Sequence, residues 1–249
     1  MSSIFFEKDL LTVIAARPGM GTTSFLIDRA LYWAYWNDKN VLFFSPDNSK
    51  EVLFNRMLCN LTGIDKNKLS SGMLDQDEVT AIRLASEYLE LSISIYDIPQ
   101  ITVPQIRRRL NRKPFPDIVI IDKLELMTSL THTNNRSAMI SDITHHLKNI
   151  SKEFHIPIIV VAQLSRELEK RNDKRPVLTD LKEYGSIEPN ADIVWLLHRD
   201  SYYDFNKDRE LFEIIVGKHF LENIESFKLK WNGECDRFYL CYDKKQTII

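Results

Sequence analysis

A run of small residues near the start of the chain has the composition of a phosphate-binding loop. The apolar residues Leu11 to Ala15 predict a strand, a turn ends at Gly21, and Thr22 begins a helical pattern. This order places backbone N–H groups and the positive end of a helix where a nucleotide's phosphates would lie. The predicted nucleotide-binding residues are Ala16, Arg17, Pro18, Gly19, Met20, Gly21, Thr22, Thr23 and Ser24.

One residue departs from the usual form of such a loop. The pattern ends in Gly-Lys-Ser/Thr, where the lysine reaches the β- and γ-phosphates and the hydroxyl holds Mg²⁺. Gly21 and the hydroxyl residue Thr23 are present, but Thr22 stands at the lysine position. We therefore expect weak binding of ATP and Mg²⁺ and little turnover.

Two other apolar strands end in polar side chains. Asp122 follows four apolar residues, as expected of a carboxylate that holds Mg²⁺ together with Thr23. An aspartate at the end of a buried strand can also serve as a helix cap. Gln163 follows the apolar run Ile158 to Ala162, where a polar side chain can sense the γ-phosphate.

The order of apolar and amphipathic segments predicts one α/β domain over residues 1–249. Strands and helices alternate up to Leu197, which predicts parallel βαβ units. Asn232-Gly233 between two strand-like runs predicts a hairpin, so we expect C-terminal antiparallel strands. Strands are expected at 11–15, 41–45, 93–96, 117–122, 157–162, 191–197, 211–218, 225–231 and 237–242, and helices at 22–36, 49–61, 75–91, 102–111 and 135–154.

Composition narrows the class of protein. A net charge of −2 argues against a basic coat for nucleic acid but permits a local basic groove. The three cysteines form no CxxC pair, which fits a reducing cytoplasm and gives no metal site. Because no apolar stretch approaches 18 residues, we expect a cytoplasmic protein without a membrane span.

Several motifs together resemble the C-terminal motor domain of the DnaB family, the ring-shaped replicative DNA helicases of bacteria and phages. The resemblance implies a RecA-like P-loop NTPase fold, ATP-dependent 5′-to-3′ unwinding, and single-stranded DNA and like subunits as partners. It covers about Asp9 to Tyr239, without the family's N-terminal domain and linker helix. The motifs are Ala15-Ala-Arg-Pro-Gly-Met-Gly21, Ile120-Ile-Asp122, Ala162-Gln-Leu-Ser-Arg166, Asp180-Leu-Lys-Glu-Tyr-Gly-Ser-Ile-Glu188, His198-Arg-Asp200, Ile214-Ile-Val-Gly-Lys218 and Trp231-Asn-Gly233.

The resemblance also assigns site residues and shows which have changed. Asp47 aligns with the family's catalytic glutamate, and Phe220 falls on its arginine finger, two residues after Lys218. A finger arginine is worth about 10³–10⁵ in turnover, so hydrolysis is expected to be close to background. Retained residues are Gln163 and Lys218 for catalysis, Thr23 and Asp122 for metal, Arg199 for nucleotide, and Lys182, Glu183 and Gly185 for DNA.

Other interpretations remain open for these residues. Asp47 can cap the helix that begins near Ser49, and Arg107 to Arg109 can be a solvated helix face rather than a DNA contact. For the whole chain, one hypothesis is a minimal helicase in which Lys218 or a partner residue replaces the missing charges. A second is a non-hydrolysing module that docks on an intact replicative helicase, and a third is a nucleotide switch of the circadian-clock or recombinase type.

Overall fold

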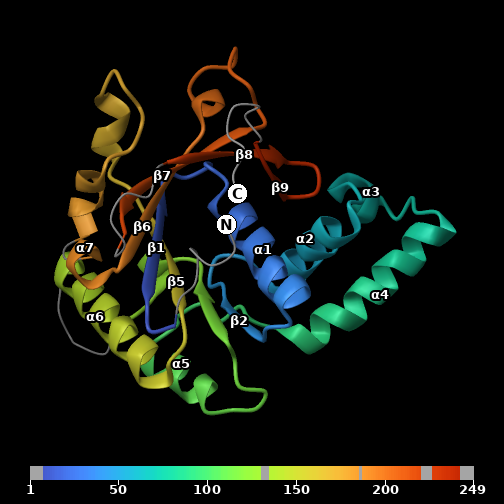
Figure 1. Cartoon of the computed structure of the whole chain (residues 1–249), viewed down its shortest axis with the longest axis horizontal. Helices are drawn as coiled ribbons and strands as arrows, with labels where there is room; N and C mark the ends of the chain where they lie inside the picture. Colours follow the sequence, from blue (N-terminus) through green and yellow to red (C-terminus); the bar gives the residue numbers. More distant parts are fainter. Residues whose placement is uncertain (1–7, 130–134, 185–186, 220–225, 242–249) are drawn as a thin grey trace, which may run out of the picture.

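A mixed sheet forms the centre of the computed structural model, which describes residues 8–129, 135–184, 187–219 and 226–241 (Figure 1). The strand order is β3-β2-β4-β5-β1-β6-β7-β8-β9, with parallel pairing up to β6 and antiparallel pairing beyond it. The predicted α/β architecture with C-terminal antiparallel strands is therefore confirmed. The strands are β1 (Leu11–Ala16), β2 (Val41–Phe44), β3 (Ile93–Tyr96), β4 (Ile118–Ile121), β5 (Ile158–Gln163), β6 (Ile193–His198), β7 (Leu211–Lys218), β8 (Phe227–Asn232) and β9 (Arg237–Leu240).

Helices cover both faces of the sheet, so its central strands are apolar along their whole length. Successive residues of β1 point to opposite faces: Val13 packs in one buried cluster and Ile14 in the other. The Ile14 face is covered by α1 (Thr22–Leu31), α2 (Lys50–Thr62) and α4 (Gln76–Ser92). The Val13 face is covered by α5 (Val103–Leu110), α6 (Arg136–Phe154) and α7 (Ile187–Asn190). The short helix α3 (Lys66–Ser71) lies between α2 and α4 in the chain.

Two predicted segments differ in detail from the structure. The helix expected to run from Thr22 to Trp36 is α-helical only to Leu31 and ends in a π-helical turn, Tyr32–Trp36. The hairpin at Asn232-Gly233 is confirmed, but its loop has four residues because Asn232 pairs with Arg237. The four-residue hairpin loop contains Asp236, whose ion pairs with Arg56 and Lys66 join segments far apart in the sequence.

The hairpin loop between β8 and β9 is held against α2 by a buried carboxylate. Asp236 is fully buried with a φ of 55°, and its carboxylate accepts from Arg56 at 2.7 Å and from Lys66 at 3.2 Å. A buried charge is costly unless it is paired, so these partners fix the loop conformation. Arg56 also donates to the Ser24 hydroxyl at 2.9 Å, which connects the hairpin to the first turn of α1.

The carboxyl ends of the parallel strands meet at one edge of the sheet. β1 pairs with β5 and β6, and β5 pairs with β4. The loop after β1, Asp122 after β4, Gln163 at the end of β5 and Arg199 after β6 therefore gather at this edge, as expected for an open α/β sheet. Within the described residues, no helix is long and apolar enough to cross a bilayer.

Candidate nucleotide site

The loop between β1 and α1 has the backbone form of an anion site. Gly19 and Gly21 adopt positive φ angles of 81° and 93°, a region that favours glycine. Gly21 is the N-cap of α1 and no side chain caps this helix end. The first-turn N–H groups and the helix dipole are therefore directed at the space in front of the loop.

The hydroxyl and carboxylate predicted to hold Mg²⁺ are in direct contact. The Thr23 hydroxyl donates to Asp122 Oδ2 at 2.7 Å, although 99 positions separate these residues. Asp122 is fully buried, and its Oδ1 has no hydrogen-bond partner among the described residues. Burial raises the pKa of Asp122, while the hydrogen bond from Thr23 opposes that rise. A buried carboxylate with an unused oxygen beside a hydroxyl fits a Mg²⁺ shell.

Asp47, the predicted catalytic carboxylate, forms an ion pair with a lysine beside this site. Lys123 Nζ contacts Asp47 Oδ2 at 2.5 Å, and both side chains are about one-third to one-half exposed (35% and 46%). Burial acts to lower the pKa of Lys123, but the hydrogen bond and charge of Asp47 outweigh it and raise that pKa. Asp47 is not the cap of α2, because the Ser49 hydroxyl accepts from the N–H of Val52 at 3.3 Å.

Gln163 lies next to the loop and contacts a half-buried glutamate, Glu125, that sequence reasoning missed. Gln163 pairs in register with Ala16, and its backbone N–H donates to Glu125 Oε1 at 2.5 Å. Burial raises the pKa of Glu125, and the hydrogen bond from Gln163 opposes that rise. Glu125 therefore connects the segment after β4 to the end of β5. The sequence feature that could have identified Glu125 is its position, three residues after Asp122.

Arg17 is committed to contacts that hold the loop. Its Nε donates to Glu169 at 2.8 Å and its Nη1 donates to the carbonyl of Leu164 at 2.7 Å. The side chain is 7% exposed. Arg17 thus ties the loop to the segment after β5 rather than replacing the missing lysine.

Two residues predicted to bind nucleotide, Gly19 and Arg199, are each in contact with an aromatic side chain. A Cβ built at Gly19 would lie 2.8 Å from the Tyr202 ring, so this tyrosine rests against the loop. The Arg199 guanidinium stacks over the Trp231 ring at 4.3 Å, and burial lowers the pKa of Arg199. Tyr202 was not predicted, since only its place in the fold brings it to Gly19.

Lys218 lies at the opposite end of the sheet from this chain's own loop. It pairs with Val194, which pairs with Val13, three residues before the end of β1 and so about 10 Å along the strand. Its Nζ donates to the carbonyls of Glu188 at 2.8 Å and Ala191 at 2.6 Å. A contact with nucleotide through Lys218 therefore requires the loop of another subunit. Phe220 lies outside the described residues.

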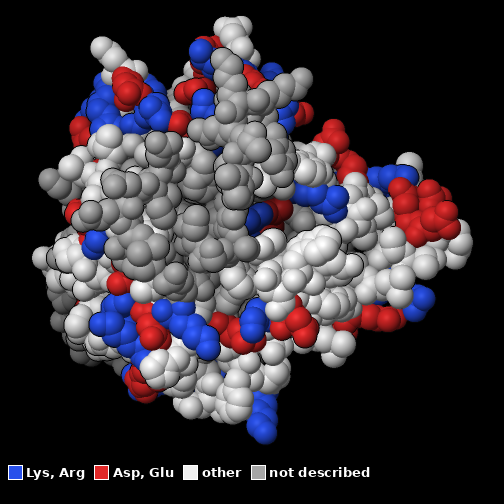
Figure 2. Space-filling model, in the orientation of Figure 1, with Lys and Arg blue, Asp and Glu red and all other residues white. Residues whose placement is uncertain are grey.

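The predicted DNA-binding segment is described only in part. The backbone of Lys182 and Glu183 belongs to a 3-10 helix, Leu178–Tyr184. Their side chains and Gly185 lie outside the described residues. Figure 2 shows basic and acidic side chains interspersed over the face in view, in agreement with the net charge of −2.

The strand order and the loop at the carboxyl edge define a RecA-like α/β fold. Residues 4–239 match the family model described as the DnaB-like helicase C-terminal domain, so this chain belongs to that family. The fold is similar to a solved DnaB-like replicative helicase, described together with its interactions with primase. The TM-score is 0.87 at 29% identity, with coverage of 95% of this chain and 58% of that one.

Two relatives are themselves replicative helicases by description. The chain is 36% identical to a probable replicative DNA helicase of Trieres chinensis over 94% of this chain and 54% of that protein. It is 36% identical to the replicative DNA helicase DnaC of Bacillus subtilis over 94% of this chain and 53% of that protein. The chain thus spans about half the length of these relatives.

Proposed function

We propose that this chain is a nucleotide-binding motor-type domain of DNA replication that binds ATP or ADP with Mg²⁺ and hydrolyses ATP slowly. The loop backbone from Gly19 to Thr23 would hold the phosphates, and Thr23 with Asp122 would hold the metal. When bound, Mg²⁺ supplies charge neutralisation at the β- and γ-phosphate oxygens. The uncapped start of α1 and the buried, half-satisfied carboxylate of Asp122 support this binding mode.

The ion pair between Lys123 and Asp47 carries the proposal of slow turnover. A general base must accept a proton from the attacking water, and Asp47 Oδ2 is already occupied by the hydrogen bond from Lys123. Thr22 also removes a cation from the place where negative charge develops in the transition state. Of the residues predicted to take part in hydrolysis, Gln163 would still position the attacking water.

A steady-state ATPase assay with and without single-stranded DNA tests this proposal. We expect Mg²⁺-dependent binding of a fluorescent ADP analogue and turnover far below that of motor enzymes, which is about 1–100 s⁻¹. Asp122→Ala should abolish the Mg²⁺-dependent part of binding. Turnover within the motor range by the wild-type chain would refute the slow-hydrolysis proposal.

The position of Lys218 favours a second candidate function, a non-hydrolysing subunit that docks on an intact replicative helicase. Its ammonium is bonded to two backbone carbonyls of its own chain, so it offers little to a neighbour's phosphates. Mixing the chain with an intact helicase subunit and measuring mass by light scattering tests this alternative. A stable homohexamer of the chain alone, with no uptake into mixed rings, would oppose it.

A further inference from the structure

The outer edge of β3 presents backbone groups that can accept an added strand. β3 ends the sheet and pairs with β2 among the described strands. In a parallel ladder the N–H and C=O of alternate residues point to the same neighbour. The N–H of Ser45 donates to the carbonyl of Tyr96 at 2.9 Å, so Ser94 and Tyr96 point to β2. The N–H and C=O of Ile95 therefore point outward and have no partner among the described residues.

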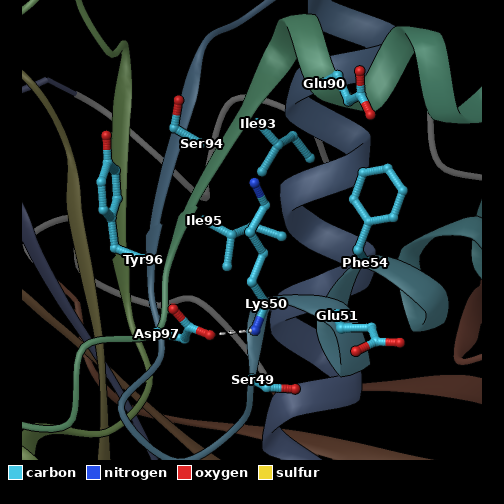
Figure 3. Close-up of a pocket in the computed structure, with 10 residues that line it drawn as sticks. All are labelled: Ser49, Lys50, Glu51, Phe54, Glu90, Ile93, Ser94, Ile95, Tyr96 and Asp97. Carbon is cyan, nitrogen blue, oxygen red and sulfur yellow. Dashed lines mark hydrogen bonds between the residues drawn. The ribbon is translucent and has the colours of Figure 1, made fainter.

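A cavity of about 800 Å³ follows this edge (Figure 3). Ile93, Ser94, Ile95 and Tyr96 all line it. Because side chains of a strand alternate between faces, a cavity that touches four consecutive residues must run along the strand edge. In Figure 3, Ile93 and Ile95 point toward the α2 side, whereas Ser94 and Tyr96 point away from it.

The wall on the α2 and α4 side combines apolar surface with negative charge. Phe54 supplies the apolar surface, and Glu51 and Glu90 supply carboxylates. The Lys50 side chain also lines the cavity, while its backbone N–H is bonded to the Asp97 carboxylate at 2.9 Å. Three carboxylates against one ammonium favour basic or apolar side chains on this side.

The wall on the α5 side has the opposite charge. The Arg109 guanidinium stacks over the Tyr96 ring at 4.2 Å. Arg109, Arg112 and Lys113 line a hollow together with Ser94 and Tyr96. Within the part of the chain that the structure describes, Arg109 and Arg112 form no ion pair. This side therefore favours acidic side chains.

We propose that the β3 edge binds an extended segment of a partner protein as an added strand. The side chains of that segment alternate between acidic residues and basic or apolar residues. Main-chain hydrogen bonds supply affinity in this mode, and the surfaces that meet alternate side chains supply specificity. The acidic set meets Arg109 and Arg112, and the basic or apolar set meets Phe54, Glu51 and Glu90. The opposite charges of the two walls thus fix which face of the segment meets which wall.

Fluorescence anisotropy with synthetic peptides and the full chain tests the proposal. The probe is the capped, labelled peptide Glu-Lys-Glu-Val-Glu-Lys. The control has the same composition in the order Glu-Lys-Lys-Glu-Glu-Val, which places one Lys and at least one Glu on each face of the strand. We expect the alternating peptide to bind at least tenfold more tightly than the control. N-methylation of the amides that face β3 should weaken the alternating peptide by a similar factor, because a methylated amide cannot donate to the strand. Equal binding of alternating and scrambled peptides would overturn the proposal.

Charge-reversal variants locate the binding to this edge. Glu90→Lys and Arg112→Glu should each weaken binding roughly three- to tenfold, in keeping with exposed ion pairs. The matched controls are Glu87→Lys, on the same helix but paired with Arg83, and Arg107→Glu, on α5 but paired with Glu153. A peptide with Glu in place of both Lys residues should regain affinity for Glu90→Lys. Controls that weaken binding as much as the edge variants would show non-specific charge attraction and reject the site.

Discussion

Lys123 Nζ lies 2.5 Å from Asp47 Oδ2, which pairs the carboxylate predicted for catalysis with a cation next in sequence to Asp122. The pair joins the end of β2 to the end of β4, two neighbouring strands of the sheet. The nucleotide site therefore retains a positive charge near Asp122 although Thr22 replaces the loop lysine. This cation faces a carboxylate rather than the loop, so it compensates poorly for the missing lysine.

Restoring the loop lysine should improve binding more than catalysis. Thr22→Lys adds a charge-assisted contact to the phosphates, which is worth about 1.5–3 kcal/mol, so we expect ATP to bind at least tenfold more tightly. Turnover should stay below the motor range because Asp47 remains paired. Thr22→Met, of similar length but neutral, is the control. Equilibrium binding and steady-state turnover on the three proteins separate the two effects.

Breaking the ion pair between Lys123 and Asp47 should raise the rate of ATP turnover only when a lysine is present at position 22. In the Thr22→Lys background, Lys123→Met should increase turnover roughly ten- to a hundredfold, because Asp47 Oδ2 is then free to accept a hydrogen bond from the attacking water. Lys123→Arg keeps the ion pair and should leave turnover unchanged. An equal increase for both substitutions would show that Asp47 is not the group being released.

The fold and the main site motif could be read from the sequence, for identifiable reasons. Strands buried on both faces are continuous apolar runs, so β1, β4 and β5 stand out without any knowledge of their neighbours. The glycines at positions 19 and 21 are required locally by positive φ angles. Asp122 was found because its position at a strand end is itself a sequence pattern.

Apart from the Thr23–Asp122 pair, which two motifs predicted together, the contacts between distant segments of the site were not predicted from the sequence. Tyr202 meets Gly19 across more than 180 positions, and the Lys123–Asp47 pair joins two separate loops. Lys218 matched a motif, but its bonds to Glu188 and Ala191 depend on the antiparallel register of β7. Such contacts depend on strand order and register, which local spacing does not encode.

The contact between Gly19 and Tyr202 predicts a double-mutant result. Gly19→Ala combines a positive φ with a Cβ placed 2.8 Å from the tyrosine ring, so it should destabilise the chain. The left-handed backbone conformation alone costs a residue other than glycine about 1–2 kcal/mol. In a Tyr202→Ala background the clash between the added Cβ and the tyrosine ring disappears, and only the cost of the positive φ angle remains. Urea denaturation of the four proteins measures the difference, and purely additive effects would mean that the ring does not press on the loop.

Lys182 provides a test of the DNA-binding prediction. If its ammonium contacts a phosphate, Lys182→Ala should reduce the slope of log affinity against log salt by about 0.7, the value for one contact with a single strand. Binding should weaken equally for different base sequences. Lys68→Ala, which removes an equal charge from a lysine paired with Glu78, is the control. An unchanged slope for Lys182→Ala would remove this residue from the DNA contacts.

The raised pKa of Asp122 predicts a pH-dependent gain in stability on its replacement. Because burial raises the pKa of this carboxyl in the folded chain above its unfolded value of 3.8, the folded state is penalised as pH rises and the group ionises. The contribution of Asp122 to the free energy of unfolding is fully present below pH 3.8, and it is lost as pH rises through the pKa of Asp122 in the folded chain. Asp122→Asn cannot ionise, so it should be more stable than wild type at pH 7, by roughly 2–4 °C in Tm for each kcal/mol relieved.

Two further measurements check the role of the Asp122 charge. The difference in Tm between wild type and Asp122→Asn should shrink as pH falls toward 3.8. Mg²⁺ should raise the Tm of wild type but not of Asp122→Asn, because the metal favours the ionised carboxylate. Thermal denaturation across this pH range, with and without Mg²⁺, measures both effects. A variant that is less stable than wild type at pH 7 would show that the surroundings stabilise the ionised carboxylate of Asp122 despite its burial.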